Sequence, residues 1–241
     1  MCGRFSRSSS RDLIAQEFGV SQFVNVDLSP RYNIAPSLNI EAIIRDGDNK
    51  RLGPMRWGFE STSTSPGTTT PINARAESIA TSPMFRDAFR RHRCLVVADG
   101  FYEWQKHGKT KTPYYIHLRS GRPFAFAGIW SLSRTAMGQK VGTCAIATCE
   151  PNELMAPIHN RMPVIFPGAV ADTWLDPKAD ETLLRQLLVP LPSEVMAAYV
   201  VSTLVNSPGN DSVECVRPIE PPVDRCRENP VEPCRRKQPK S

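Results

Sequence analysis

The sequence predicts an α+β fold, in which a single domain is built on a curved, barrel-like, mainly antiparallel sheet with helices at its periphery. The chain contains a succession of strand-like segments joined mostly by short turns, which is typical of strongly curved or closed antiparallel sheets. Few segments have helical character, and they are short. A length of 241 residues favours one sizeable core over two small ones.

The N-terminal part of the chain is expected to supply one helix and a first hairpin. A serine, Ser9 or Ser10, can cap a helix over residues 11–18, and a glycine follows as its stop. Residues 39–45 and 51–59 have strand character and are separated by an Asp-Gly-Asp turn.

Two segments of this region are predicted to be loops. Residues 29–36, with proline near both ends, favour an ordered loop over regular structure. Residues 61–70 contain only serine, threonine, proline and glycine, a low-complexity polar composition that cannot pack by itself.

The rest of the chain continues the pattern of strands with a few helices. Ser82 and Pro83 can begin a helix with an arginine-rich edge. Residues 101–105 and 112–118 flank Lys106-His107-Gly108-Lys109 and predict a second hairpin. Further strands are expected at 94–98, 124–131, 142–148, 162–166 and 197–202, and further helices at 169–175 and 181–188.

The predicted domain covers residues 1–221. From residue 222 onward the composition changes to proline, arginine, lysine, glutamate and asparagine, so 222–241 is expected to be a disordered basic tail. No signal peptide is visible, and no apolar run approaches the ~18 residues that span a bilayer. The default expectation is a cytoplasmic monomer.

Charge and cysteine content narrow the class of function. Thirty Lys and Arg against 24 Asp and Glu give a net charge of +6, which points mildly to a polyanionic partner. A solvated basic surface is the alternative explanation. Seven cysteines without a CxxC pair argue against both a disulfide framework and a structural zinc site. We therefore expect no metal and no cofactor.

The second residue, Cys2, has unusual chemistry if Met1 is removed. Its α-amine, with a pKa near ~8, would then lie beside a thiol with a pKa near ~8.5. An amine can condense with an aldehyde to an imine, and the thiol can then close a five-membered thiazolidine ring. A small residue that merely follows the start codon is the alternative.

Three other stretches combine reactive side chains with turn-like surroundings. If residues 73–77 are extended, Asn73, Arg75 and Glu77 share one face, which suits either a site or the polar face of an edge strand. Glu103 lies between two aromatic residues, so burial can raise its pKa and suit it to acid–base work, unless it pairs with a nearby cation. His159 lies among Pro157, Asn160 and Arg161, a setting for either a catalytic or a structural histidine.

Six motifs that occur in order give these stretches a context, and the resulting pattern resembles the SOS-response-associated peptidase family, also known as abasic-site processing proteins. The resemblance covers roughly residues 2–220. The motifs are Met1-Cys2-Gly3-Arg4-Phe5, Arg31-Tyr32-Asn33-Ile34-Ala35-Pro36, Met55-Arg56-Trp57-Gly58, Ile72-Asn73-Ala74-Arg75-Ala76-Glu77, Ala98-Asp99-Gly100-Phe101-Tyr102-Glu103-Trp104 and Ile158-His159-Asn160-Arg161-Met162-Pro163.

The resemblance implies a sensor of DNA damage that captures abasic sites in single-stranded DNA through a covalent thiazolidine. It implies that Cys2 is the nucleophile, that Asn73 orients it, that Glu103 donates and accepts protons, and that His159 assists. His159 would also take part in crosslink reversal and strand cleavage.

Four further residues would bind the DNA. The resemblance implies phosphate contacts for Arg4 and Arg75, as guanidinium groups can make. Trp57 and Phe101 are predicted to stack on neighbouring bases.

One departure from the family pattern concerns the segment between two motifs. The Trp-Gly motif usually continues through Pro-x-Trp, whereas residues 61–70 replace that segment here and the second tryptophan is absent.

Two other functions stay open: a cysteine-type peptidase acting in trans, and a module that binds single-stranded DNA without a covalent bond.

Overall fold

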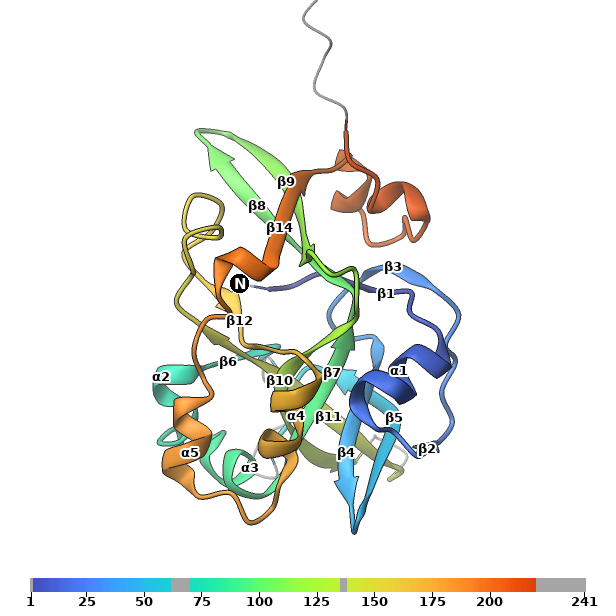
Figure 1. The fold of residues 1–241 in the computed structure, drawn as a ribbon, viewed down its shortest axis with the longest axis vertical. Helices are drawn as coiled ribbons and strands as arrows, with labels where there is room; N and C mark the ends of the chain where they lie inside the picture. Colours follow the sequence, from blue (N-terminus) through green and yellow to red (C-terminus); the bar gives the residue numbers. More distant parts are fainter. Residues whose placement is uncertain (1, 62–69, 135–137, 220–241) are drawn as a thin grey trace, which may run out of the picture.

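The computed structural model describes residues 2–61, 70–134 and 138–219. The predicted tail, 222–241, and most of the predicted polar loop lie outside these residues. The strands β1 to β14 form two sheets, and short helices lie around the sheets (Figure 1). The predicted α+β class, with a barrel-like and mainly antiparallel sheet, is confirmed.

Five strands of the larger sheet close into a barrel. Four antiparallel pairings join the strands in the order β11-β10-β7-β4-β5. The strand β5 then pairs in parallel with β11, at Thr143↔Arg56 and Cys144↔Trp57. The strands are β4 (Asn39–Asp46), β5 (Asn49–Trp57), β7 (Arg93–Ala98), β10 (Phe124–Arg134) and β11 (Lys140–Cys149). Short strands extend this sheet: β2 (Gln22–Phe23), β6 (Asn73–Arg75), β12 (Met162–Pro163) and β13 (Ile165–Phe166).

The smaller sheet has the order β14-β9-β8-β1-β3. Its strands are β1 (Phe5–Arg7), β3 (Arg31–Ile34), β8 (Gly100–His107), β9 (Thr110–Leu118) and β14 (Met196–Val200). Phe5 pairs with Phe101, and the Tyr102 amide donates to the Arg4 carbonyl at 2.9 Å, so β1 brings the start of the chain alongside β8. This pairing places Cys2 next to the strand that carries Glu103.

The helices are short and peripheral. They are α1 (Arg11–Phe18), α2 (Ala76–Ile79), α3 (Arg86–Arg91), α4 (Gly168–Leu175) and α5 (Glu181–Gln186), with single 3₁₀ turns η1 (Ser193–Val195), η2 (Thr203–Asn206) and η3 (Val213–Cys215). The predicted helix 11–18 is confirmed: the Leu13 amide donates to the Ser10 hydroxyl at 3.3 Å, and Gly19 ends the helix with φ of 63°.

Four sequence expectations need correction. The helix expected to begin at Ser82 and Pro83 begins later, because α3 starts at Arg86 with Phe85 as its N-cap. The predicted loop 29–36 contains β3, because pairing with β1 satisfies its backbone. The predicted strand 162–166 is split into β12 and β13, with the Val164 amide bonded to the Ala147 carbonyl between them. The extended segment 73–77 ends at Arg75, where the chain turns into α2, so Glu77 is helical and does not share a strand face with Asn73.

The core lies inside the barrel and between it and the smaller sheet. Phe5 makes edge-to-face contacts with Trp57 and Phe126, at centroid distances of 5.2 and 5.7 Å. Phe101 contacts Phe126 in the same manner, at 6.1 Å. These four aromatic rings pack the start of the chain against both sheets and fix the position of Cys2.

Candidate functional site

Cys2 lies at the edge of this core and is fully buried. Its carbonyl oxygen accepts a hydrogen bond from Nδ2 of Asn73 at 3.0 Å. Burial, with a smaller contribution from the negative charge of Glu103, raises the pKa of the Cys2 thiol well above its ordinary value. The sulfur is therefore a neutral thiol in this environment.

Asn73 is positioned by the barrel. It lies on β6, which pairs in parallel with β11 at Ile146↔Asn73, and the Ile146 amide donates to the Ile72 carbonyl at 3.0 Å. While Nδ2 holds the Cys2 carbonyl, Oδ1 is buried and has no hydrogen-bond partner among the described residues. A buried acceptor without a donor costs free energy, so Oδ1 is suited to accept from a bound molecule.

Glu103 faces the same region from β8. Its side chain is 4% exposed, and Oε2 lies 4.0 Å from Nε2 of His159, whose side chain is 22% exposed. Burial raises the pKa of Glu103, and the charge of His159 opposes that rise. A carboxyl group whose pKa is moved toward neutrality can both donate and recover a proton.

The hydrogen bonds of His159 define which ring nitrogen carries its proton. The Arg161 amide donates to Nδ1 at 3.0 Å, and the Arg161 carbonyl lies 3.1 Å from the same nitrogen. Because a backbone amide always carries its proton, Nδ1 acts as the acceptor. The neutral ring then bears its proton on Nε2, the nitrogen that faces Glu103.

An ion pair holds the segment that carries His159. Arg161 donates two hydrogen bonds to the carboxylate of Glu77, at 2.6 and 2.9 Å, and a third to the Thr148 carbonyl at 2.6 Å. The Arg161 hydrogen bonds lower the pKa of Glu77. From the other side, Nε2 of Gln105 donates to the Pro157 carbonyl at 2.8 Å. These contacts join α2, β11 and β8 around one histidine.

The two arginines predicted to bind phosphate have different surroundings. Arg75 is exposed and makes no hydrogen bond or ion pair with a described residue. Arg4 is half-buried: its Nη1 donates to Oδ1 of Asn33 and to the Val205 carbonyl, both at 2.7 Å, and its guanidinium lies 6.0 Å from the centre of the Trp104 ring. Arg75 is thus available to a ligand, whereas Arg4 also braces the fold.

The prediction that Trp57 and Phe101 stack on bases is wrong for this structure, because both side chains have 0% exposure. Nε1 of Trp57 donates to the Ile72 carbonyl at 2.9 Å, so the indole helps to anchor the strand of Asn73. Phe101 packs in the core. Trp104 is partly exposed instead, although its Nε1 is bonded to Asn206 at 2.7 Å.

Sequence reasoning missed the contacts by which Glu77, Arg161 and Gln105 hold the segment that carries His159. The first two belong to the motifs quoted above, and their opposite charges were the available signal. Gln105 carried no signal, because its contact with the Pro157 carbonyl joins two distant segments.

Two further features are absent among the described residues. No group of three or more His, Cys, Asp or Glu in residues 2–61, 70–134 and 138–219 has the geometry to hold a metal ion. Within the same ranges, no helix has the length and apolarity to cross a membrane.

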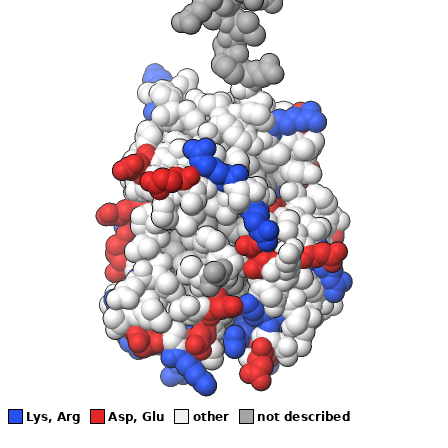
Figure 2. Space-filling model, in the orientation of Figure 1, with Lys and Arg blue, Asp and Glu red and all other residues white. Residues whose placement is uncertain are grey.

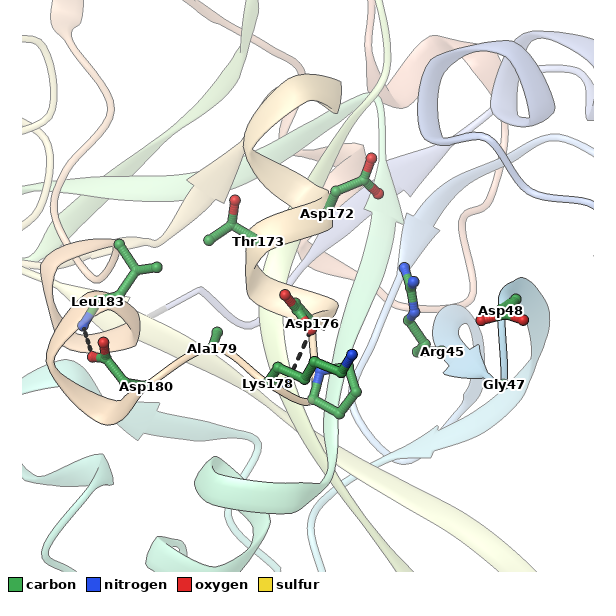
Figure 3. A pocket seen from close by; sticks show the side chains of 11 residues that line it. Arg45, Gly47, Asp48, Asp172, Thr173, Asp176, Lys178, Ala179, Asp180 and Leu183 are labelled. Atoms are coloured by element: carbon green, nitrogen blue, oxygen red, sulfur yellow. Dashed lines mark hydrogen bonds between the residues drawn. The ribbon is translucent and has the colours of Figure 1, made fainter.

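The structure also contains a pocket of about 670 Å³ between the β4–β5 turn and the α4–α5 region. Its polar lining combines acidic and basic side chains, among them Arg45, Asp172 and Lys178 (Figure 3). None of the predicted site residues lines it.

The fold is an α+β barrel that places a buried cysteine at position two close to an amide, a carboxyl group and an imidazole. The chain belongs to the family described as SOS response associated peptidase (SRAP), whose model matches residues 1–208. The predicted resemblance is confirmed.

Relatives from distant organisms share this fold or sequence. The chain is 45% identical over 221 residues to the abasic site processing protein YoqW of Bacillus subtilis, covering 90% of this chain and 99% of the relative. It is 28% identical over 230 residues to the abasic site processing protein YedK of Escherichia coli, covering 91% and 100%. A crystal structure of a protein from Bacteroides thetaiotaomicron superposes with a TM-score of 0.81 at 26% identity, covering 91% of this chain and all of the other.

Proposed function

We propose that this protein processes abasic sites in single-stranded DNA by forming a covalent bond with them through Cys2. The observation that carries the proposal is the hydrogen bond from Asn73 to the Cys2 carbonyl, next to a buried carboxyl group with a raised pKa. Relatives that match nearly the whole chain are named abasic site processing proteins, which supports the same substrate.

The proposed reaction begins after Met1 has been removed. The abasic sugar opens to its aldehyde, and the Cys2 amine adds to the aldehyde carbon to give a carbinolamine. Loss of water leaves an imine. The Cys2 thiol then adds to the imine carbon while its proton passes to the imine nitrogen, which closes a thiazolidine, so one water is released overall.

Glu103 and His159 supply the proton transfers in this scheme. Ring opening needs a proton on the ring oxygen, and loss of water needs a proton on the departing hydroxyl. Glu103, whose pKa is raised by burial, can provide each proton and recover it. The thiol also needs a base, because its own pKa is raised. His159, partly exposed and 4.0 Å from Glu103, can exchange protons with solvent.

Positive charge can hold the strand during these steps. Arg75 is exposed on β6, close to Asn73, and suits a phosphate beside the lesion. The positive charge of Arg4 can also attract the strand, although its Nη1 already donates to Asn33 and to the Val205 carbonyl.

The test compares abasic and intact single strands of one sequence on a denaturing gel. Wild type should give a slow band with the abasic strand alone, and Cys2→Ala should give none. Cys215→Ala, which changes another buried cysteine far along the chain, serves as the matched control and should crosslink normally. Equal bands from wild type and Cys2→Ala would refute the covalent role of Cys2.

We infer a second activity, removal of Met1 by the chain itself, because the family is described as a peptidase. Glu103 is the group near Cys2 that can move the required proton. Intact mass of Glu103→Ala should then show retained Met1, whereas Arg75→Ala should show complete removal. Complete removal in Glu103→Ala would assign this step to a separate aminopeptidase.

A further inference from the structure

The β8–β9 hairpin continues beyond the sheet as a two-stranded ribbon. β1 accompanies β8 only as far as the hydrogen bond between Tyr102 and Arg4, and the β14 ladder ends at Val200↔Tyr114. From Gln105↔Thr112 to the turn, no third strand flanks the ribbon among the described residues. In Figure 1 the ribbon projects from the body, starting close to the beginning of the chain.

The ribbon carries three lysines, Lys106, Lys109 and Lys111, which are all exposed. None of them makes a hydrogen bond or an ion pair with a described residue, and residues 104–113 include no acidic side chain. Lys106 lies directly opposite Lys111 in the antiparallel register. Blue side chains accordingly stand at the end of this hairpin, at the upper left of Figure 2.

This arrangement is unfavourable for the protein alone. Like charges directly opposite each other destabilise an antiparallel pair, and an isolated two-stranded ribbon is only marginally stable in water. A polyanion lying along the ribbon would remove the repulsion and add favourable contacts. The charge pattern therefore points to an anionic partner with several regularly spaced charges.

The base of the ribbon is fixed relative to the candidate site. Gln105 donates to the Pro157 carbonyl at 2.8 Å and accepts from the Tyr114 hydroxyl at 3.1 Å, which ties the ribbon to the segment that leads to His159. Gly108, with φ of 58°, allows a tight two-residue turn at the tip. A strand of DNA held at Glu103 would thus meet the ribbon in a defined position.

We propose that the lysine ribbon, Lys106, Lys109 and Lys111, is a second DNA-binding surface that holds phosphates of the strand flanking the lesion. This inference rests on the proposed function. His107 lies four residue steps along the strand from Glu103, a span of ~13 Å. At ~3.4 Å per nucleotide in a stacked strand, the tip reaches a phosphate about four nucleotides from the lesion. Lysine suits such contacts, since its flexible point charge binds phosphate regardless of sequence.

The test measures the salt dependence of binding. A single strand with a tetrahydrofuran analogue of the abasic site, which has no aldehyde, reports noncovalent affinity by fluorescence anisotropy. In Lys106→Gln/Lys109→Gln/Lys111→Gln the slope of log K against log salt should fall by about 2, because each lost phosphate contact removes ~0.7. Arg45→Gln/Lys140→Gln/Lys178→Gln removes equal charge; Arg45 and Lys178 line the separate pocket in Figure 3, and this variant should keep the wild-type slope.

Strand length gives a second readout. Trimming the strand to two nucleotides on each side of the analogue should remove the difference between wild type and the ribbon variant, and trimming one side at a time identifies the side the ribbon holds. The ribbon variant should melt no lower than wild type, because it loses a repulsion, so weaker binding would not reflect unfolding.

The outcomes separate the two proposals. Equal slopes for wild type and the ribbon variant, or the same loss in the charge-matched control, would overturn the ribbon as a binding surface. If the ribbon variant crosslinks short abasic strands at the wild-type rate, the site is intact and the loss belongs to the ribbon. Failure of wild type to crosslink any abasic strand would instead overturn the proposed function, and the salt slopes would still test the ribbon.

Discussion

The Nε2 atom of His159 lies 4.0 Å from the Oε2 atom of Glu103, although the two residues come from a loop and a strand far apart in the sequence. The Arg161 amide fixes the opposite nitrogen of the ring as an acceptor, so the protonated nitrogen points at the carboxyl group. One pair can therefore hold a proton close to Cys2 and exchange it with solvent.

Replacing Glu103 with Gln should slow crosslinking by on the order of 10²-fold or more, because general acid–base catalysis contributes about 10² to 10⁴. The amide has nearly the same shape but cannot exchange a proton. Rates are measured by stopping the reaction at successive times and separating the products on denaturing gels. Glu41→Gln, a change of the carboxylate that pairs with the buried Arg7, is a control for losing a buried carboxylate elsewhere. A wild-type rate in Glu103→Gln would exclude the acid–base role.

The raised pKa of Glu103 also predicts a pH dependence of stability. A carboxyl group whose folded-state pKa lies above its ordinary value of 4.5 contributes stability that is fully present below pH 4.5 and is lost as pH rises through the folded-state pKa. Glu103→Gln, which does not titrate, should therefore gain stability relative to wild type as pH rises. Urea unfolding at pH 4 and pH 8 measures the difference. A gap between the two proteins that is constant with pH would contradict the raised pKa.

The ion pair between Glu77 and Arg161 should control the tautomer of His159. In Glu77→Gln the guanidinium loses its charged partner, and Arg161, whose backbone amide donates to Nδ1 of His159, is then held less firmly. Nitrogen NMR shifts of the imidazoles should show His159 as the Nε2–H form in wild type and as a mixture in the variant, and Glu77→Asp should restore much of the wild-type signal.

His117 serves as an internal reference in the same spectrum. Its Nδ1 lies 2.8 Å from the Leu118 carbonyl, which requires the Nδ1–H form. An unchanged His159 signal in Glu77→Gln would show that the ion pair does not set the tautomer.

The side-chain amide of Asn73 should support crosslinking because its Nδ2 donates to the Cys2 carbonyl. Asn73→Asp keeps the shape but replaces the donor that holds the Cys2 carbonyl with an acceptor, and a buried hydrogen bond lost in this way costs about 1–3 kcal/mol. Crosslinking should fall by roughly 10-fold to 100-fold, while Asn152→Asp, another amide that donates to a backbone carbonyl, should leave the rate unchanged. A normal rate in Asn73→Asp would remove Asn73 from the site.

The sequence predicted local features well because their signals are local. The Ser10 cap and the Gly19 stop lie within a few residues of the helix they bound, and the Asp-Gly turn lies between the strands it joins. The barrel-like sheet followed from the same logic, since short turns make sequential strands neighbours.

The features that were missed or wrong depend on contacts between distant segments. Trp57 and Phe101 became core residues because β1 and the closure of the barrel cover them, which no local pattern reveals. The contact between Asn73 and Cys2 joins residues 71 positions apart, and their association came from the family resemblance rather than from spacing. Glu77 does not lie on the expected strand face, because the chain turns into α2 at Ala76.

The thiazolidine at Cys2 is tested most directly by mass spectrometry of the product formed with an abasic single strand, followed by mapping of its N-terminal peptide. We expect a protein without Met1, joined to the strand with loss of one water, in which the Cys2 thiol resists alkylation because it is part of the ring. A crosslinked N-terminal peptide whose Cys2 thiol is still alkylated, or a product that retains Met1, would contradict the thiazolidine.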